Sequence, residues 1–88
     1  MLNKYYELLN LLNNNGYATS LFEEHFDDEI IESAVIGNKN YFIDISPIGN
    51  YIEIEVVSRN EVEYSIIETK IYKNVKSAFN FIKKYLED

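Results

Sequence analysis

The clearest pattern in the chain is a strict alternation of apolar and polar residues in its middle, which predicts β-strands. Successive side chains of a strand point to opposite faces, so every second residue shares a face. Residues 41–46 and 51–58 both alternate in this way, with Glu53 and Glu55 in the polar phase. The apolar phase, which we expect to face a core, comprises Tyr41, Ile43, Ile45, Ile52, Ile54 and Val56.

Two further segments, residues 31–36 and 62–72, are rich in Ile, Val and Tyr and also suit strands. The adjacent pair Ile66 and Ile67 breaks the alternation of the second segment and indicates a bulge. Turn-forming residues at 37–40, 47–50 and 59–61 separate the four segments. Such short connections between successive strands are typical of an antiparallel meander.

Before these strands, residues 17–22 suit a short strand because they include aromatic and β-branched residues. The acidic run that follows, residues 23–29, has no clear period. We therefore interpret it as an exposed connection with room for one helical turn.

The two ends of the chain have helical periodicity instead. In residues 2–14, Tyr5, Leu8, Leu9 and Leu12 follow the spacing of one helix face, and Gly16 suits the position just after the helix. Asn74 is a suitable N-cap for a second helix that runs to about Leu86. The apolar face of this second helix comprises Val75, Ala78, Phe79, Ile82, Tyr85 and Leu86.

These elements predict a single α+β domain over residues 1–88. Its order is helix, three or four antiparallel strands in a meander, and helix. The two amphipathic helices are the elements that can cover the apolar face of the sheet, so we expect both on that face. The opposite face of the sheet should then be exposed to solvent, with Glu53 and Glu55 on it.

The charge of the chain is strongly asymmetric. The net charge is −7, yet residues 1–69 hold 13 acids against three bases, whereas residues 70–88 hold five lysines against two acids. An acidic body argues against direct binding of nucleic acid, which requires Lys and Arg to neutralise phosphates. It favours a basic protein partner.

Composition also bears on location. The chain has no Cys, no signal-peptide pattern and no apolar run of the length that spans a bilayer, so we expect a cytoplasmic protein without a membrane partner. Ile, Asn, Lys, Tyr and Phe, all encoded by AT-rich codons, make up 43 of the 88 residues, which indicates a low-GC bacterial host. The oligomeric state is left open by the sequence.

Catalysis has little support in these residues. The chain has one His, one Arg and no Cys, and its three Gly are isolated, so neither an activated nucleophile nor a phosphate-binding loop is visible. His25 lies among carboxylates that are chemically able to hold a divalent ion, but the run has no ligand spacing of a known site. We therefore expect a non-enzyme without metal or cofactor.

The candidate partner-binding residues are the carboxylates of the acidic run and of the outer sheet face. Regularly spaced carboxylates can imitate a phosphate backbone and compete for a nucleic-acid groove, although solubility alone also explains such charge. Tyr51 shares the strand face of the sheet acids and offers a large rigid contact area with a polar tip. The set is Glu23, Glu24, Asp27, Asp28, Glu53, Glu55 and Tyr51.

Small size, acidity, AT-rich coding and the helix–meander–helix order together resemble the small phage-encoded inhibitors of bacterial defence, above all the anti-CRISPR proteins. The resemblance rests on no motif and assigns no functional residue. It implies an inhibitor that occludes the nucleic-acid-binding surface of a protein such as a Cas effector. Two alternatives stay open: an immunity protein or antitoxin that caps a basic toxin, and a homo-oligomeric adaptor that pairs through a strand edge or a Tyr patch.

Overall fold

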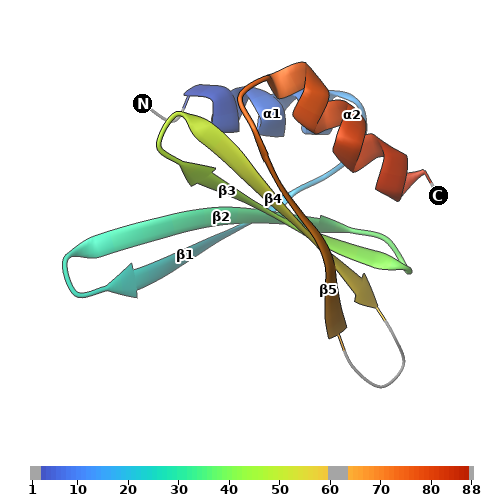
Figure 1. Ribbon diagram of the computed structural model, residues 1–88. Helices are drawn as coiled ribbons and strands as arrows, with labels where there is room; N and C mark the ends of the chain where they lie inside the picture. Colours follow the sequence, from blue (N-terminus) through green and yellow to red (C-terminus); the bar gives the residue numbers. More distant parts are fainter. Residues whose placement is uncertain (1–2, 60–63, 88) are drawn as a thin grey trace.

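A computed structural model describes residues 3–59 and 64–87 (Figure 1). The order of elements is α1 (Asn3–Asn14), β1 (Ser20–Phe26), β2 (Glu29–Gly37), β3 (Tyr41–Ile48), β4 (Tyr51–Arg59), β5 (Tyr64–Tyr72) and α2 (Val75–Leu86). The strands form one open sheet in the order β1-β2-β3-β4-β5, and each pairs antiparallel with its neighbour in the chain. The predicted α+β meander with a helix at each end is confirmed.

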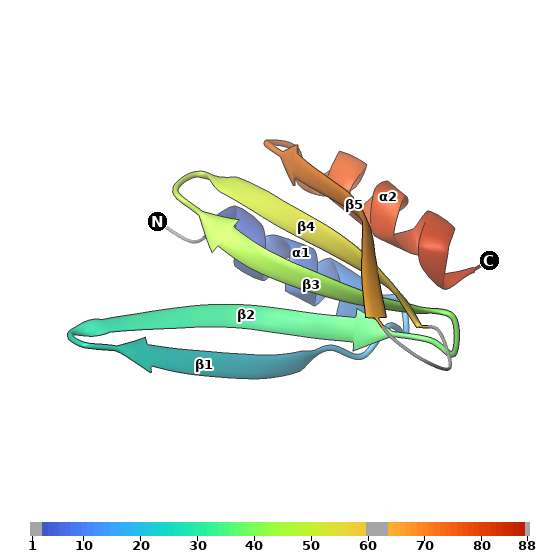
Figure 2. The same ribbon diagram turned by 60° about the horizontal axis from the view of Figure 1, so that its bottom comes forward.

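Both helices lie side by side on one face of the sheet (Figure 2). α1 contacts β3 and β4, and α2 contacts β3, β4 and β5. The core between the two layers comprises Tyr5, Leu8, Leu9, Leu12, Ala34, Ile36, Ile43, Ile45, Ile52, Ile54, Val56, Ala78, Phe79 and Ile82. Each fully buried Leu or Ile in this set contributes about 1.5–3 kcal/mol relative to an exposed side chain.

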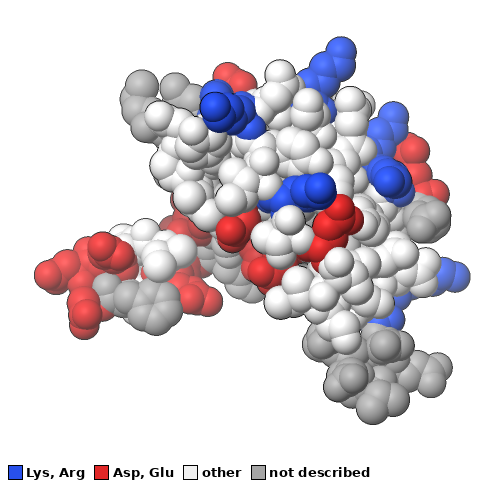
Figure 3. Space-filling view, viewed as in Figure 1, with Lys and Arg blue, Asp and Glu red and all other residues white. Residues whose placement is uncertain are grey.

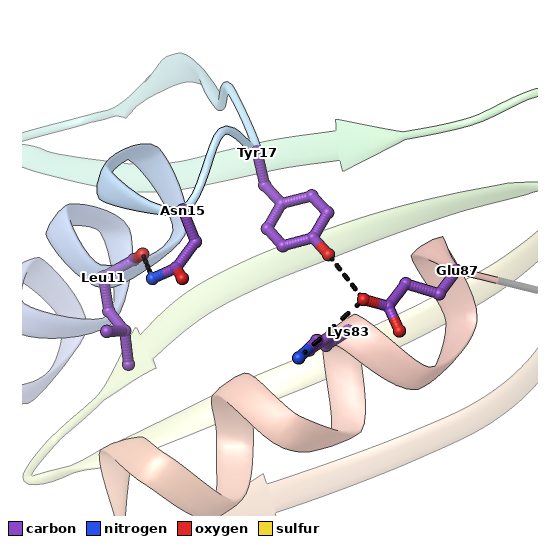
Figure 4. Close-up of polar contacts among 5 residues, drawn as sticks. All are labelled: Leu11, Asn15, Tyr17, Lys83 and Glu87. Carbon is purple, nitrogen blue, oxygen red and sulfur yellow. Dashed lines mark hydrogen bonds and ion pairs between the residues drawn. The ribbon is translucent and has the colours of Figure 1, made fainter.

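Local contacts fix the ends of both helices, and Figure 4 shows those between the segment after α1 and the end of α2. The Asn74 side chain accepts a hydrogen bond from the Ser77 amide at 3.0 Å, as expected of an N-cap. After α1, the chain turns at Gly16, whose φ of 87° is the left-handed conformation that glycine tolerates. The Tyr17 hydroxyl then donates to the Glu87 carboxylate at 3.0 Å, and this ties the segment after α1 to the end of α2.

Residues 23–29 differ from the sequence prediction. They do not form an exposed connection with a helical turn: β1 runs through residue 26, and β2 begins at Glu29. The Asp27–Asp28 turn joins the two strands, with Asp27 at a positive φ of 51°. Asp is one of the few non-glycine residues that adopt this conformation readily, because its short side chain hydrogen-bonds locally. The predicted short strand over 17–22 therefore starts later and is longer.

The hairpin of β1 and β2 extends beyond the rest of the sheet (Figures 1 and 2). β2 pairs with β3 only from Ala34, opposite Ile45, to Gly37, opposite Phe42. The first half of β2 therefore pairs with β1 alone. We call residues 23–32, the outer part of this hairpin, the hairpin arm.

The turn predicted at residues 47–50 is shorter than expected. β3 continues through Pro47 to Ile48, and Gly49 and Asn50 alone make the turn, with Gly49 at a φ of 57°. Proline lacks an amide hydrogen and is confined to strand positions where no ladder bond is needed. At Pro47 the partner on the β2 side has already diverged, so β3 is a local edge there.

The predicted bulge in the last strand is confirmed. Val56 pairs with Glu68 and Val57 with Ile66, which leaves Ile67 as the additional residue of β5. The start predicted for this strand at residue 62 lies outside the described residues, as do positions 60 and 61 of the predicted turn.

Candidate functional site

The sheet face opposite the helices is the candidate site, because no element covers it among the described residues (Figure 2). Asp44 lies between Ile43 and Ile45, which are fully buried, so it points away from the helices. Opposite it on β4, Glu55 lies between Ile54 and Val56, which are also fully buried. The outer face predicted for the sheet acids is thus the face that the structure leaves open.

The hairpin arm carries the densest negative charge in the described part of the chain. Six of its ten residues are acids, and between Lys4 and Lys39 the sequence has no Lys or Arg. Figure 3 shows the arm as an acidic projection at the left of the view, separate from the Lys and Arg side chains (blue). The acids of the arm are Glu23, Glu24, Asp27, Asp28, Glu29 and Glu32.

The structure brings some of the predicted site residues together and separates others. Directly opposed residues share a face, and Glu24 lies opposite Ile31, in the phase of the uncovered face. Glu23 lies on the other side of the arm, opposite Glu32, while Asp27 and Asp28 occupy the tip. Glu24 therefore connects the arm with the acids of the sheet face.

The pKa of Asp44 reports this connection. Partial burial raises the pKa of Asp44, and the negative charges of Glu55 and then of Glu24 raise it further. A weak hydrogen bond from the Ser46 hydroxyl, at 3.4 Å, acts in the opposite direction. Besides burial, Glu55 of β4 and Glu24 of β1 thus lie close enough to act on the Asp44 carboxylate of β3.

Two pairs of acids stand directly opposite each other on neighbouring strands. Asp44 faces Glu55 across β3 and β4, and Glu23 faces Glu32 across β1 and β2. Like charges in directly opposed positions destabilise a sheet. Of these four acids, Glu32 accepts a hydrogen bond from the Tyr6 hydroxyl at 2.8 Å, and Glu23 lies 3.8 Å from the His25 imidazole. Both contacts are exposed and compensate little.

An apolar stripe crosses the uncovered face beside these acids. It has one side chain from each strand: Phe22, Val35, Phe42, Val57 and Ile66. Phe22 is 53% exposed and Ile66 is 63% exposed, and the other three are half-buried. Exposed apolar patches of this kind mark interaction surfaces.

Two shallow hollows lie along the stripe and share Phe42. One, of about 260 Å³, is lined by Phe22, Val35 and the acids Glu24 and Asp44. The other, of about 360 Å³, is lined by Val57, Ile66 and Arg59. The Arg59 guanidinium carbon lies 5.6 Å from the centre of the Phe42 ring, within the range of a cation–π contact.

Sequence reasoning missed this stripe. The sequence does contain a sign of it. Phe42 and Val57 are apolar residues at positions of the alternating pattern that face away from the core, where polar residues are expected. The alignment of five such residues depends on the strand register, which the sequence pattern does not specify.

Tyr51 lies on the uncovered face as predicted, 39% exposed. The Lys73 ammonium lies 5.4 Å from the centre of its ring, so one side of the ring already has a cation partner. Tyr51 lies opposite Ile48, at the end of the β3–β4 pair next to the Gly49–Asn50 turn.

The described residues also bear on metal binding and on membrane crossing. Within them, no group of three or more His, Asp or Glu side chains is arranged to hold a metal ion. Neither described helix has the length and apolar character that crossing a bilayer requires.

Comparisons with protein-family models, with curated proteins and with solved structures found no match for this chain.

Proposed function

We propose that this protein is a non-catalytic inhibitor that occupies the basic, nucleic-acid-binding surface of a partner protein. The observation that carries the proposal is the direct opposition of Asp44 and Glu55 on the uncovered face. This arrangement lowers the stability of the free protein. A Lys or Arg of a partner placed between the two carboxylates would remove this repulsion, so relief of the repulsion would add to the free energy of binding.

The apolar stripe supports the same proposal, because it could supply the apolar contacts that give an interface its affinity. Stable protein interfaces combine a desolvated apolar centre with a polar rim, and a few anchors in the centre carry most of the binding energy. Here Phe42 lies between two hollows, and acids border one of them. The face therefore offers a centre for apolar contact and a rim that selects a basic partner.

The proposed mechanism is occlusion without turnover. The hairpin arm extends from the body, so its carboxylates reach a recessed basic groove before the body does (Figure 3). Charge of one sign accelerates association with an oppositely charged partner, and salt screens this attraction beyond a Debye length of about 8–10 Å. Once bound, the carboxylates occupy the positions of phosphates.

The test is capture of the partner from a lysate of a low-GC bacterium on the immobilised full chain, followed by a competition assay. Fluorescence anisotropy of a labelled oligonucleotide on the captured, purified partner measures whether the inhibitor displaces nucleic acid. We expect competitive displacement that weakens as salt rises. A variant with Glu24→Lys, Glu53→Lys and Glu55→Lys should lose at least about tenfold in affinity, or roughly 1.4 kcal/mol.

Glu7→Lys is a control for the effect of a charge reversal, because Glu7 is exposed on α1, on the covered side of the sheet. It should bind the partner like the parent protein. If the triple variant binds as tightly as the parent, or if the bound partner keeps its nucleic acid, the proposed function is wrong.

A further inference from the structure

We infer that the free edge of β1 binds an extended segment of the partner as an additional strand. The segment carries two adjacent basic residues followed by two apolar ones. This inference rests on the proposed function and deepens it, because it names the form in which the basic partner is recognised.

β1 is a smooth, uninterrupted edge. It is the first strand of the sheet, and its register with β2 runs from Ser20, opposite Val35, to residue 26, opposite Glu29, without a shift. The strand contains neither Pro nor Gly nor Lys. Along its other side, the backbone amide and carbonyl groups of such an edge can pair with an incoming strand.

The opposite edge of the sheet is protected. β5 contains the bulge at Ile67, which interrupts regular pairing and increases the local twist. Lys70 lies within the strand, 3.9 Å from Glu68. Bulges and edge lysines are the devices by which proteins prevent strand addition. β1 has no bulge and no Lys, and its edge charges are the acids Glu23 and Glu24, which leave the edge open to a basic strand.

The acids of β1 disfavour the full-length pairing of two β1 edges. The antiparallel register that pairs all of Ser20–Phe26 with itself sets Glu23 directly opposite Glu23 of the other copy. It also sets Phe22 opposite Glu24. Like charges in directly opposed positions are unfavourable, so this register is weaker than one that sets basic residues opposite Glu23 and Glu24.

The side chains of β1 define the occupant. Leu21 and Phe22 are adjacent, exposed by 58% and 53%, and point to opposite faces. Glu23 and Glu24 follow, again one on each face. An antiparallel strand would place two basic residues opposite Glu24 and Glu23 and then two apolar residues opposite Phe22 and Leu21, which matches both faces.

The hairpin arm also lacks the packing that normally supports a strand. It is a two-stranded ribbon, and Ile30 and Ile31 on β2 remain exposed on its two faces. Isolated two-stranded ribbons are marginal in water, and a third strand is the usual source of independent stability. Strand addition at β1 would therefore order the arm as it forms the complex.

The test uses the full chain and a short synthetic peptide in which two adjacent lysines precede a valine and a tyrosine, with threonines at both ends. Two N-methylated versions carry the methyl groups on alternate backbone amides, in opposite phases. An added strand directs alternate amides toward β1, so one phase should bind at least about tenfold more weakly and the other like the parent peptide. Amide hydrogen exchange should slow in β1 and stay unchanged in β5.

A charge exchange supplies the matched control. The double variant Glu23→Lys/Glu24→Lys should no longer bind the lysine peptide. It should instead bind a peptide that has two glutamates in place of the two lysines. Glu7→Lys should leave lysine-peptide binding unchanged, since Glu7 is exposed on α1.

The outcomes separate this inference from the proposed function. If both methylated phases bind equally, or if exchange slows elsewhere than in β1, strand addition is refuted while acidic docking on a basic partner stands. If neither the peptide nor a captured partner binds, both are refuted.

Discussion

Replacement of Asp44 by Asn tests whether the uncovered face is built at the expense of stability. Asp44→Asn preserves side-chain shape and an acceptor for the Ser46 hydroxyl, yet it removes the repulsion with Glu55 across the strand pair. Directly opposed Cβ atoms lie about 4.5–5.5 Å apart, and a like-charged pair at this spacing destabilises by about 0.2–1 kcal/mol. We therefore expect the variant to be more stable at neutral pH by about 0.5–1 kcal/mol, or roughly 2–8 °C in Tm.

The pH dependence has a definite sign. Because the pKa of Asp44 is raised in the folded protein, the folded state binds more protons than the unfolded state between the ordinary pKa of 3.8 and the raised pKa. Stability of the parent therefore falls as the pH rises through this window, and it stays reduced above it. The advantage of Asp44→Asn should be full at pH 7 and should disappear as the pH falls toward 3.8.

Thermal unfolding followed by circular dichroism, at neutral pH and at several acidic values, measures both effects. Glu7→Gln is the matched control, because it removes one exposed negative charge from α1 without removing an opposed acid. If Asp44→Asn melts at or below the parent temperature at pH 7 while the control is neutral, the argument from like-charge opposition is wrong. The same variant should bind the partner more weakly, so its gain in stability and its loss of affinity have one origin.

Two further predictions test the fold. Leu8→Ala removes a fully buried side chain of α1 and should lower the free energy of unfolding by about 2–5 kcal/mol. Its control, Leu21→Ala on the exposed edge strand, should change the free energy of unfolding by less than about 0.5 kcal/mol. Equal losses in chemical denaturation would contradict the assignment of core and edge. Asn74→Ala removes the cap of α2 and should cost about 1 kcal/mol, while Asn80→Ala, at an exposed position within α2, should not destabilise; a neutral Asn74→Ala would show that the cap contributes nothing.

The parts of the fold that the sequence predicted are those with one buried face. β3 and β4 alternate because Ile43, Ile45, Ile52 and Ile54 face the helices while their neighbours face solvent. The outer part of β1 has no such pattern, since both of its faces are exposed, so the sequence pattern predicts a connection there. The turn predicted to begin at Pro47 was wrong for a different reason. The missing amide hydrogen of proline interrupts a strand only where a neighbouring strand would accept a hydrogen bond from it, and β2 no longer pairs with β3 at Pro47.

The acids of the candidate site could be predicted from the sequence, but its apolar stripe could not. Glu53 and Glu55 stand in the polar phase of a regular strand, so their face followed from the alternation. The apolar stripe did not follow, because Phe22, Phe42 and Ile66 are far apart in the sequence and become neighbours only through the register of five strands.

The placement of the two helices has a consequence for biosynthesis. α1 and α2 come from opposite ends of the chain, yet they lie side by side and together close the core (Figure 1). Translation delivers α1 before the strands and α2 after them, so the apolar face of the sheet stays partly uncovered until α2 has left the ribosome. Each hairpin can form as soon as its own strands emerge, but the cooperative core cannot. Nascent chains that stop before residue 75 lack α2 and should therefore depend on chaperones.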